Sequence, residues 1–246
     1  MEYSPLPVEV SPKSWIDRLQ AVFEILLLSG LISGFLAALV LPLFRIRTTE
    51  FLLKDIKVLS IYLLLESGIA LLILAAILKL HREAVHSLGF RGEHWKRNFV
   101  IGLALVPFLF LINGIVAILF KVYLPEYYME QNPLVENLHT PQQLALFIFS
   151  ALIAGGIKEE IQRAFIINRF RSYLGGAGTG LLLWSLAFGA GHYVQGVQGI
   201  VIASLYGFLF GGIYLLSGSL IAPIAAHGAY DTLAILAYYF FSDKIK

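Results

Sequence analysis

The stretch Gly155-Gly-Ile-Lys-Glu-Glu-Ile-Gln-Arg-Ala-Phe-Ile-Ile-Asn-Arg-Phe-Arg171 decides how this chain folds. It continues an apolar run, residues 144–153, and yet four charged side chains follow within two helical turns: Lys158, Glu159, Glu160 and Arg163. A charged side chain inside a membrane-spanning helix costs about 2.5–3.5 kcal/mol on insertion scales, so such residues usually face a polar interior and have a function. We therefore expect a membrane helix that contributes to a functional site.

The composition of the whole chain supports a membrane environment. The 246 residues are 58% hydrophobic and only 14% charged, with a mean hydropathy of +0.78. Soluble domains are nearer 45–50% apolar and about 25% charged, so the chain is predicted to be an all-α polytopic membrane protein. The net charge of +2 gives no basis for nucleic-acid binding. The absence of cysteine excludes disulfides, thiolate zinc sites and a cysteine nucleophile.

Apolar segments of membrane-spanning length recur along the chain, which predicts a bundle of about seven transmembrane helices, with eight as the alternative. We expect residues 1–20 to form an amino-terminal tail and residues 21–246 a single transmembrane domain, since no polar linker is long enough to separate two. The predicted location is the cell membrane, as a multi-pass protein. The expected spans are 21–44, 58–80, 99–120, 140–170, 179–193, 200–216 and 220–241.

The fourth of these spans has a recognisable start. Thr140-Pro-Gln-Gln143 has threonine in the N-cap position, proline at the first helical position and glutamine three residues after the cap. A helix from there to about Phe170 is roughly 45 Å long, which exceeds the thickness of the bilayer core. The sixth span contains Gly207-x-x-x-Gly211, a spacing that allows two helices to approach closely.

Two later helices offer polar groups that match the charged stretch. His192 lies in one of them, four residues after Phe188, and His227 and Asp231 lie on one face of the other. Together with a glutamate, these groups can hold a divalent metal ion, as in a zinc site whose ligands come from several helices. They can equally position one water molecule, with the glutamate as general base and histidine polarising the scissile carbonyl or its oxyanion.

Three segments resemble the motifs of the CPBP family, which contains the type II CAAX prenyl endopeptidases and the bacterial Abi-type proteins that process bacteriocins. They are Glu159-Glu160 with Arg163, Phe188-x-x-x-His192 and His227-x-x-x-Asp231, and the resemblance covers about residues 140–236. It implies an α-helical intramembrane endopeptidase, of metalloprotease or glutamate type, in which glutamate activates water and histidines assist. The implied catalytic core is about residues 140–236, and the implied partners are the lipid bilayer and a membrane-associated peptide or protein substrate, with prenylated chains among the candidates.

The first motif departs from the family pattern, which is Glu-Glu-x-x-x-Arg. Here the arginine comes one residue early, so an alignment on Arg163 moves Lys158 into the first glutamate position, whereas an alignment on the glutamates puts Ala164 in the place of the arginine. One residue rotates a helix by about 100°, and a π-type bulge beyond Gly155-Gly156 is one way to absorb the difference. The last position also differs, because it is Asp231 where many relatives have asparagine.

The predicted catalytic residues are Glu159, Glu160, His192, His227 and Asp231. Glu159 falls within the motif under both alignments and is our choice of general base, with Glu160 as the substitute, and Arg163 is expected to orient a glutamate. If a metal is bound, zinc is the leading candidate. Its ligands are expected to be His192, His227 and Asp231.

Two other functional classes remain open. In the first class, the protein is a family member that has lost catalysis and acts as an immunity or scaffold protein. The departure in the first motif is the argument for it. Intramembrane carboxylates and histidines also serve small transporters. Transporters commonly contain inverted repeats, and no convincing internal repeat is present here.

Other polar groups have simpler interpretations. Glu24, near the start of the first span, is predicted to be solvated, and His81 is predicted to be an ordinary surface residue. Glu66 lies deeper in the second span, where we expect it to pair with a basic residue.

Overall fold

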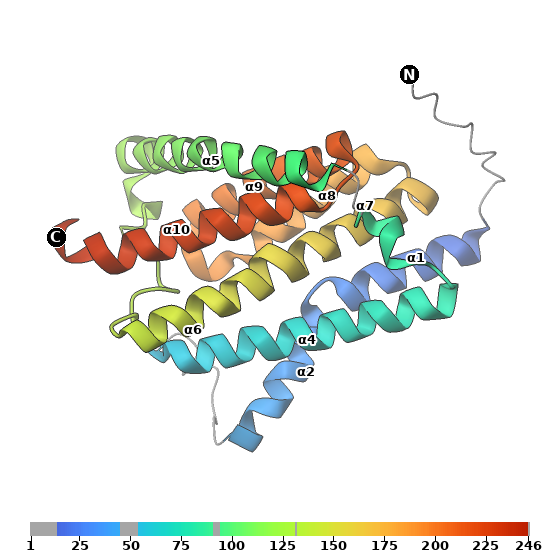
Figure 1. The fold of residues 1–246 in the computed structure, drawn as a ribbon, viewed down its shortest axis with the longest axis horizontal. Coiled ribbons are helices and arrows are strands. Elements are labelled where there is room, and N and C mark those ends of the chain that lie inside the picture. Colours follow the sequence, from blue (N-terminus) through green and yellow to red (C-terminus); the bar gives the residue numbers. More distant parts are fainter. Residues whose placement is uncertain (1–13, 45–53, 91–93, 131, 246) are drawn as a thin grey trace.

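The computed structural model describes residues 14–44, 54–90, 94–130 and 132–245, and every regular element within these ranges is helical (Figure 1). The predicted all-α membrane bundle is thereby confirmed. Residues 1–13 of the predicted tail lie outside the described ranges. The main helices are α1 Trp15–Leu28, α2 Leu31–Val40, α4 Ile56–His81, α5 Trp95–Tyr123, α6 Pro141–Ala151, α7 Glu160–Tyr173, α8 Ala177–Gly191, α9 Gly196–Ser217 and α10 Ile221–Ile245, with a π-helix, η4 Leu152–Glu159, between α6 and α7.

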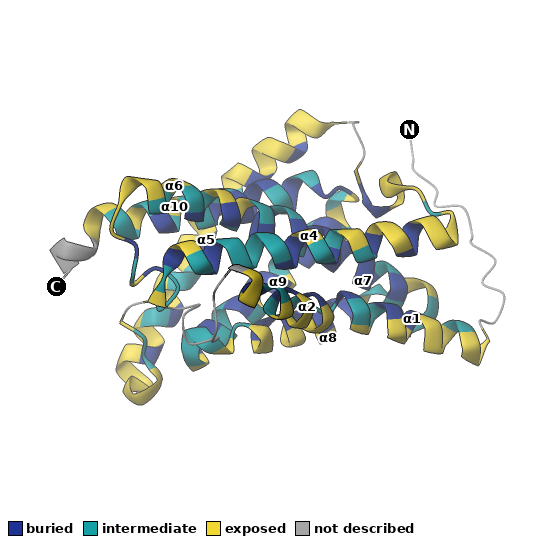
Figure 2. Cartoon of the chain, turned by 90° about the horizontal axis from the view of Figure 1, so that it is seen from below, coloured by how far each residue is buried: buried dark blue, intermediate teal, exposed yellow. Residues whose placement is uncertain are grey.

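Four helical segments in the described ranges are long and apolar enough to cross a membrane: 15–43, 56–81, 95–123 and 193–217. Their outward faces carry exposed apolar side chains, for example Leu72, Phe108 and Phe208 (Figure 2). Apolar surface on this scale is expected against lipid and not against water. The chain is therefore a membrane protein, and the predicted seven crossings remain a prediction.

The first predicted span, 21–44, is not one helix. It is broken at Ser29 and Gly30 into α1 and α2, and α1 begins at Trp15, within the stretch predicted as a tail. The break occurs because Gly30 adopts the left-handed conformation, with φ of 91°, which an α-helix cannot continue through. Beyond the break, α2 turns toward α4, and the hydroxyl of Ser33 donates a hydrogen bond to Glu66 (2.7 Å).

The helix that contains the charged stretch runs from Pro141 to Tyr173 through α6, η4 and α7 and lies between α4 and α10 (Figure 1). Its start is the predicted capping box: the Thr140 hydroxyl accepts from the backbone N–H of Gln143, and the Gln143 side chain accepts from the N-cap backbone. Both interactions satisfy N–H groups that a helix start leaves unpaired.

Helices α8 and α9 make the closest pair, as the glycine spacing predicted. A Cβ on Gly207 would lie 3.1 Å from the backbone of Ser185, and one on Gly211 would lie 2.5 Å from Leu181. A side chain at either position would require its neighbour to move, so the two glycines permit the close packing of α8 and α9.

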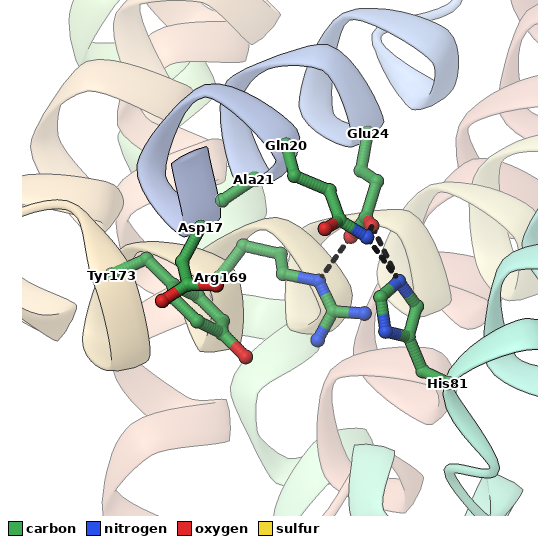
Figure 3. Close-up of a pocket in the computed structure, with 7 residues that line it drawn as sticks. All are labelled: Asp17, Gln20, Ala21, Glu24, His81, Arg169 and Tyr173. Atoms are coloured by element: carbon green, nitrogen blue, oxygen red, sulfur yellow. Dashed lines mark hydrogen bonds and ion pairs between the residues drawn. The ribbon is translucent and has the colours of Figure 1, made fainter. Parts of the chain in front are cut away.

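The prediction for Glu24 was wrong, and His81, which is exposed as predicted, is an ion-pair partner of Glu24. Glu24 is only 5% exposed, and its two oxygens contact Nε of Arg169 (2.6 Å) and Nε2 of His81 (2.6 Å). Figure 3 shows these side chains converging from α1, α4 and α7 around a small polar pocket of about 110 Å³. Glu83 contacts Arg169 as well (2.9 Å). No pattern in the sequence indicated that α1 packs on α7, and this contact is what buries Glu24.

We predict that Glu24→Ala destabilises the protein by about 3 kcal/mol, because breaking a buried ion pair leaves the charge of Arg169 poorly compensated. The measurement is the unfolding free energy in detergent micelles under increasing denaturant. Glu126→Ala, which removes an exposed carboxylate from a connecting segment, is the control and should have little effect. Equal stability of the two variants would contradict the role given to the Glu24 cluster.

Candidate active site

The site is built around a π-helical turn. Residues Leu152–Glu159 form η4, which contains Gly155 and Gly156 near its centre. A π-helix has hydrogen bonds from residue i to i+5, so it contains more residues per turn than an α-helix, and such insertions often occur at functional sites. The bulge considered for the shortened first motif is therefore present, and it sets the direction in which Lys158, Glu159 and Glu160 leave the helix.

The two glycines let η4 touch α10 directly. A Cβ on Gly155 would lie 2.6 Å from Oδ2 of Asp231 and 3.2 Å from Nε2 of His227. A Cβ on Gly156 would lie 3.2 Å from the Cα of Gly228. Any side chain at Gly155 would thus enter the space that the polar groups of α10 occupy.

Both glutamates contact His227, on opposite nitrogens of its ring. Nδ1 donates a hydrogen bond to Oε1 of Glu160 (2.7 Å). Nε2 lies 4.0 Å from Oε2 of Glu159 and 3.5 Å from Oδ2 of Asp231. The predicted partnership of His227 with these carboxylates is therefore seen in the structure, and the two glutamates occupy different positions in it.

Glu160 belongs to the closed side of the site. Its side chain is 1% exposed and forms an ion pair with Arg163, which is equally buried. The guanidinium carbon of Arg163 lies 4.6 Å from the ring centre of Phe188 and 5.6 Å from that of Phe210. Phe210 also stacks on His227, with ring centres 4.7 Å apart. Arg163 thus holds Glu160, as predicted for an arginine that orients a glutamate, and Glu160 in turn holds the ring of His227.

Glu159 and Asp231 belong to the more open side. Their side chains are 18% and 27% exposed, against 9% for His227. A carboxylate that must take a proton from water needs contact with water, so this difference separates the two glutamates chemically. Glu159 meets that requirement, whereas Glu160 is enclosed by Arg163 and His227.

His192 completes the set from α8. It lies immediately after Gly191, the last residue of α8, and its Nδ1 donates to the backbone carbonyl of Phe188 (2.8 Å), as the four-residue spacing suggested. Nε2 is then the nitrogen left to act on a substrate. His192 and His227 both interact electrostatically with Glu159.

Some site contacts were not foreseen from the sequence. Glu66 pairs with a basic residue as expected, but that residue is Lys158 (2.9 Å), which also lies 3.6 Å from Glu159. The only sequence feature that pointed to Lys158 as a site residue was its position in the charged stretch. No signal pointed to Phe210, because a phenylalanine in an apolar helix is indistinguishable from a packing residue.

The predicted zinc ligands do not converge. Within the described ranges, no group of three or more His, Asp and Glu side chains is arranged to hold a metal ion. Nδ1 of His227 and Nδ1 of His192 are both engaged with protein oxygens. These bonds leave Nε2 of each ring as its remaining donor, but three donors do not converge on one point in the described ranges as a tetrahedral zinc site requires, and zinc remains a prediction.

We predict that Arg163→Met lowers the unfolding free energy by about 3 kcal/mol, because it leaves the buried carboxylate of Glu160 without its cation. Arg163→Lys should restore only part of the loss, since an ammonium group lacks the planar shape that fits between the two phenylalanine rings. The measurement is the melting temperature of each purified variant, compared with that of the unchanged protein. A lysine variant as stable as the unchanged protein would show that charge alone is required.

Comparison with known proteins points to the same segment. A family model described as Rce1-like, type II CAAX prenyl endopeptidase Rce1-like, matches residues 140–233. No match was found among curated proteins or among solved structures. The matched residues begin at the Thr140 cap and end just beyond Asp231, so they include every predicted catalytic residue. The segment that forms this site, residues 140–233, is thus similar to the Rce1-like family of type II CAAX prenyl endopeptidases.

Proposed function

We propose that the protein is an intramembrane endopeptidase in which Glu159 is the general base. The observation that carries the proposal is the unequal placement of the two glutamates around His227. Glu159 is partly exposed beside Nε2, whereas Glu160 is 1% exposed and bonded to Nδ1. The two glutamates therefore have different roles: the buried carboxylate of Glu160 fixes the histidine ring, and the more exposed carboxylate of Glu159 accepts a proton.

The reaction follows from these positions. Glu159 takes a proton from a water molecule, whose oxygen attacks the carbonyl carbon of the scissile peptide bond. His192 and His227 act on the carbonyl oxygen in their protonated forms. In each ring Nδ1 donates to a protein oxygen, and the N–H at Nε2 stabilises the negative charge that develops on the carbonyl oxygen. When the carbon–nitrogen bond breaks, the proton on Glu159 passes to the leaving amine. Asp231 lies one helical turn from His227 and fixes the Nε2 side of its ring.

The proposed substrate is a membrane-associated peptide or protein, with a prenylated chain as the first candidate to test. The family description supports this choice. The four apolar segments long enough to cross a membrane support it as well, because a lipid-modified chain end is delivered at the bilayer and not from bulk water. The cell membrane is the proposed location.

The alternative of an inactive scaffold protein rested on the shortened first motif. The contacts of Glu159 and Glu160 with His227 favour the enzyme, since the π-helical turn brings both carboxylates to the histidine despite the missing residue. No observation in the described residues favours the transporter.

We predict that Glu159→Gln reduces cleavage of a farnesylated peptide by about 100- to 10,000-fold while the protein stays folded, since general-base catalysis contributes about 10²–10⁴-fold. Glu160→Gln should lower both activity and thermal stability, because Arg163 then lacks its carboxylate. The assay is turnover by purified protein in lipid vesicles, with Glu126→Gln as control. Near-normal turnover of the Glu159 variant would assign the base to another residue.

A metal requirement is tested separately. We expect protein treated with a strong chelator, and shown by elemental analysis to be free of zinc, to keep its activity within about twofold, because no three of the described His, Asp and Glu side chains converge on one point. Loss of activity that returns specifically on addition of zinc would establish the metal-dependent alternative.

A further inference from the structure

We propose that Lys158, held in place by Glu66, is a positioning residue for Glu159. The inference rests on the proposed function, because it assigns a role relative to the general base. Nζ of Lys158 lies 2.9 Å from Oε2 of Glu66 and 3.6 Å from Oε1 of Glu159. One ammonium group therefore joins a carboxylate of α4 to the carboxylate that takes the proton.

The ion pair of Lys158 and Glu66 is buried, and added stability does not explain its presence. The side chains of Lys158 and Glu66 are 9% and 8% exposed. The desolvation of two buried charges roughly offsets their attraction, and replacement by well-packed apolar residues is often neutral or stabilising. A lysine and a glutamate kept inside a membrane bundle are therefore more simply explained by what they do to a neighbouring group.

Glu66 is itself held on both oxygens. Ser33 donates from α2 to Oε1 (2.7 Å), and Lys158 occupies Oε2. The contact with Ser33 depends on the break at Gly30, which turns α2 toward α4. With both oxygens engaged, the carboxylate of Glu66 is a fixed acceptor that holds the lysine in one position.

The lysine contact gives the two oxygens of Glu159 different neighbours. Oε1 faces the ammonium group of Lys158, and Oε2 faces Nε2 of His227 (4.0 Å). The ion pair with Lys158 restricts the rotation of the Glu159 carboxylate and keeps Oε2 on the histidine side, where it takes the proton from water. Lys158 thereby directs the base toward the substrate, and Glu66 keeps the lysine from swinging away.

The test compares four variants: Lys158→Met, Glu66→Gln, the double variant and Lys158→Arg. Each single neutral variant leaves one buried charge unpaired and is expected to lose stability, so the double variant, which removes both charges, is the decisive one. The probe is a farnesylated fluorogenic peptide, and kcat and KM are measured in lipid vesicles per folded molecule. Glu24→Gln is the matched control, because Glu24 is also a buried ion-pair carboxylate but lies in the separate cluster with Arg169.

We expect the double variant to lose about 100-fold in kcat with KM within about twofold, as for a misplaced catalytic group that still binds substrate. Lys158→Arg should recover most of kcat, since it restores the cation. The Glu24 control should lose stability without loss of kcat. A folded double variant with kcat within about threefold of the unchanged protein overturns the inference. Absence of cleavage by the unchanged protein overturns the proposed function, and this inference with it.

Discussion

The approach of η4 onto α10 is the contact on which the rest of the site depends. It is possible because Gly155 and Gly156 have no side chain, and a Cβ at the first would lie 2.6 Å from Asp231. Through this contact the carboxylates of one helix reach the histidine of another without long, flexible side chains between them. Positions set by backbone packing lose little conformational freedom when a substrate arrives, which is how a preorganised site lowers a barrier.

Charge burial gives the bundle its second constraint. Glu66 with Lys158, Glu160 with Arg163 and Glu24 with Arg169 are each almost fully enclosed. Two of the three pairs join different helices and therefore restrict which helices can pack together. Two helices in apolar contact can shift along each other at little cost, whereas a shift that separates a buried ion pair leaves its charges unpaired. Specificity of packing, more than added stability, is what these pairs contribute.

The grouping of His227 with the two glutamates was predicted from the rarity of charged groups in apolar helices and from the family resemblance. From hydropathy and from the residue pattern of a helix start, the sequence predicted the helical membrane fold and the Thr140 cap. It did not predict the break at Gly30 or the burial of Glu24, since both depend on how α1 and α2 pack on other helices. The directions of Glu159 and Glu160 were equally out of reach. A π-helical turn is a property of backbone hydrogen bonds, and the pair Gly155-Gly156 permits one without requiring it.

The charged helix also bears on how the protein is made. Residues 141–173 are not among the segments apolar enough to cross a membrane by themselves, whereas 56–81 and 95–123 are. Each charge in the helix adds about 2.5–3.5 kcal/mol to the free energy of entering lipid alone. During synthesis, α4 is produced before this helix and already carries the carboxylate of Glu66 that Lys158 will meet. Insertion of the charged helix beside α4 would pair one of its charges at once, so the order of the helices along the chain favours assembly of the site.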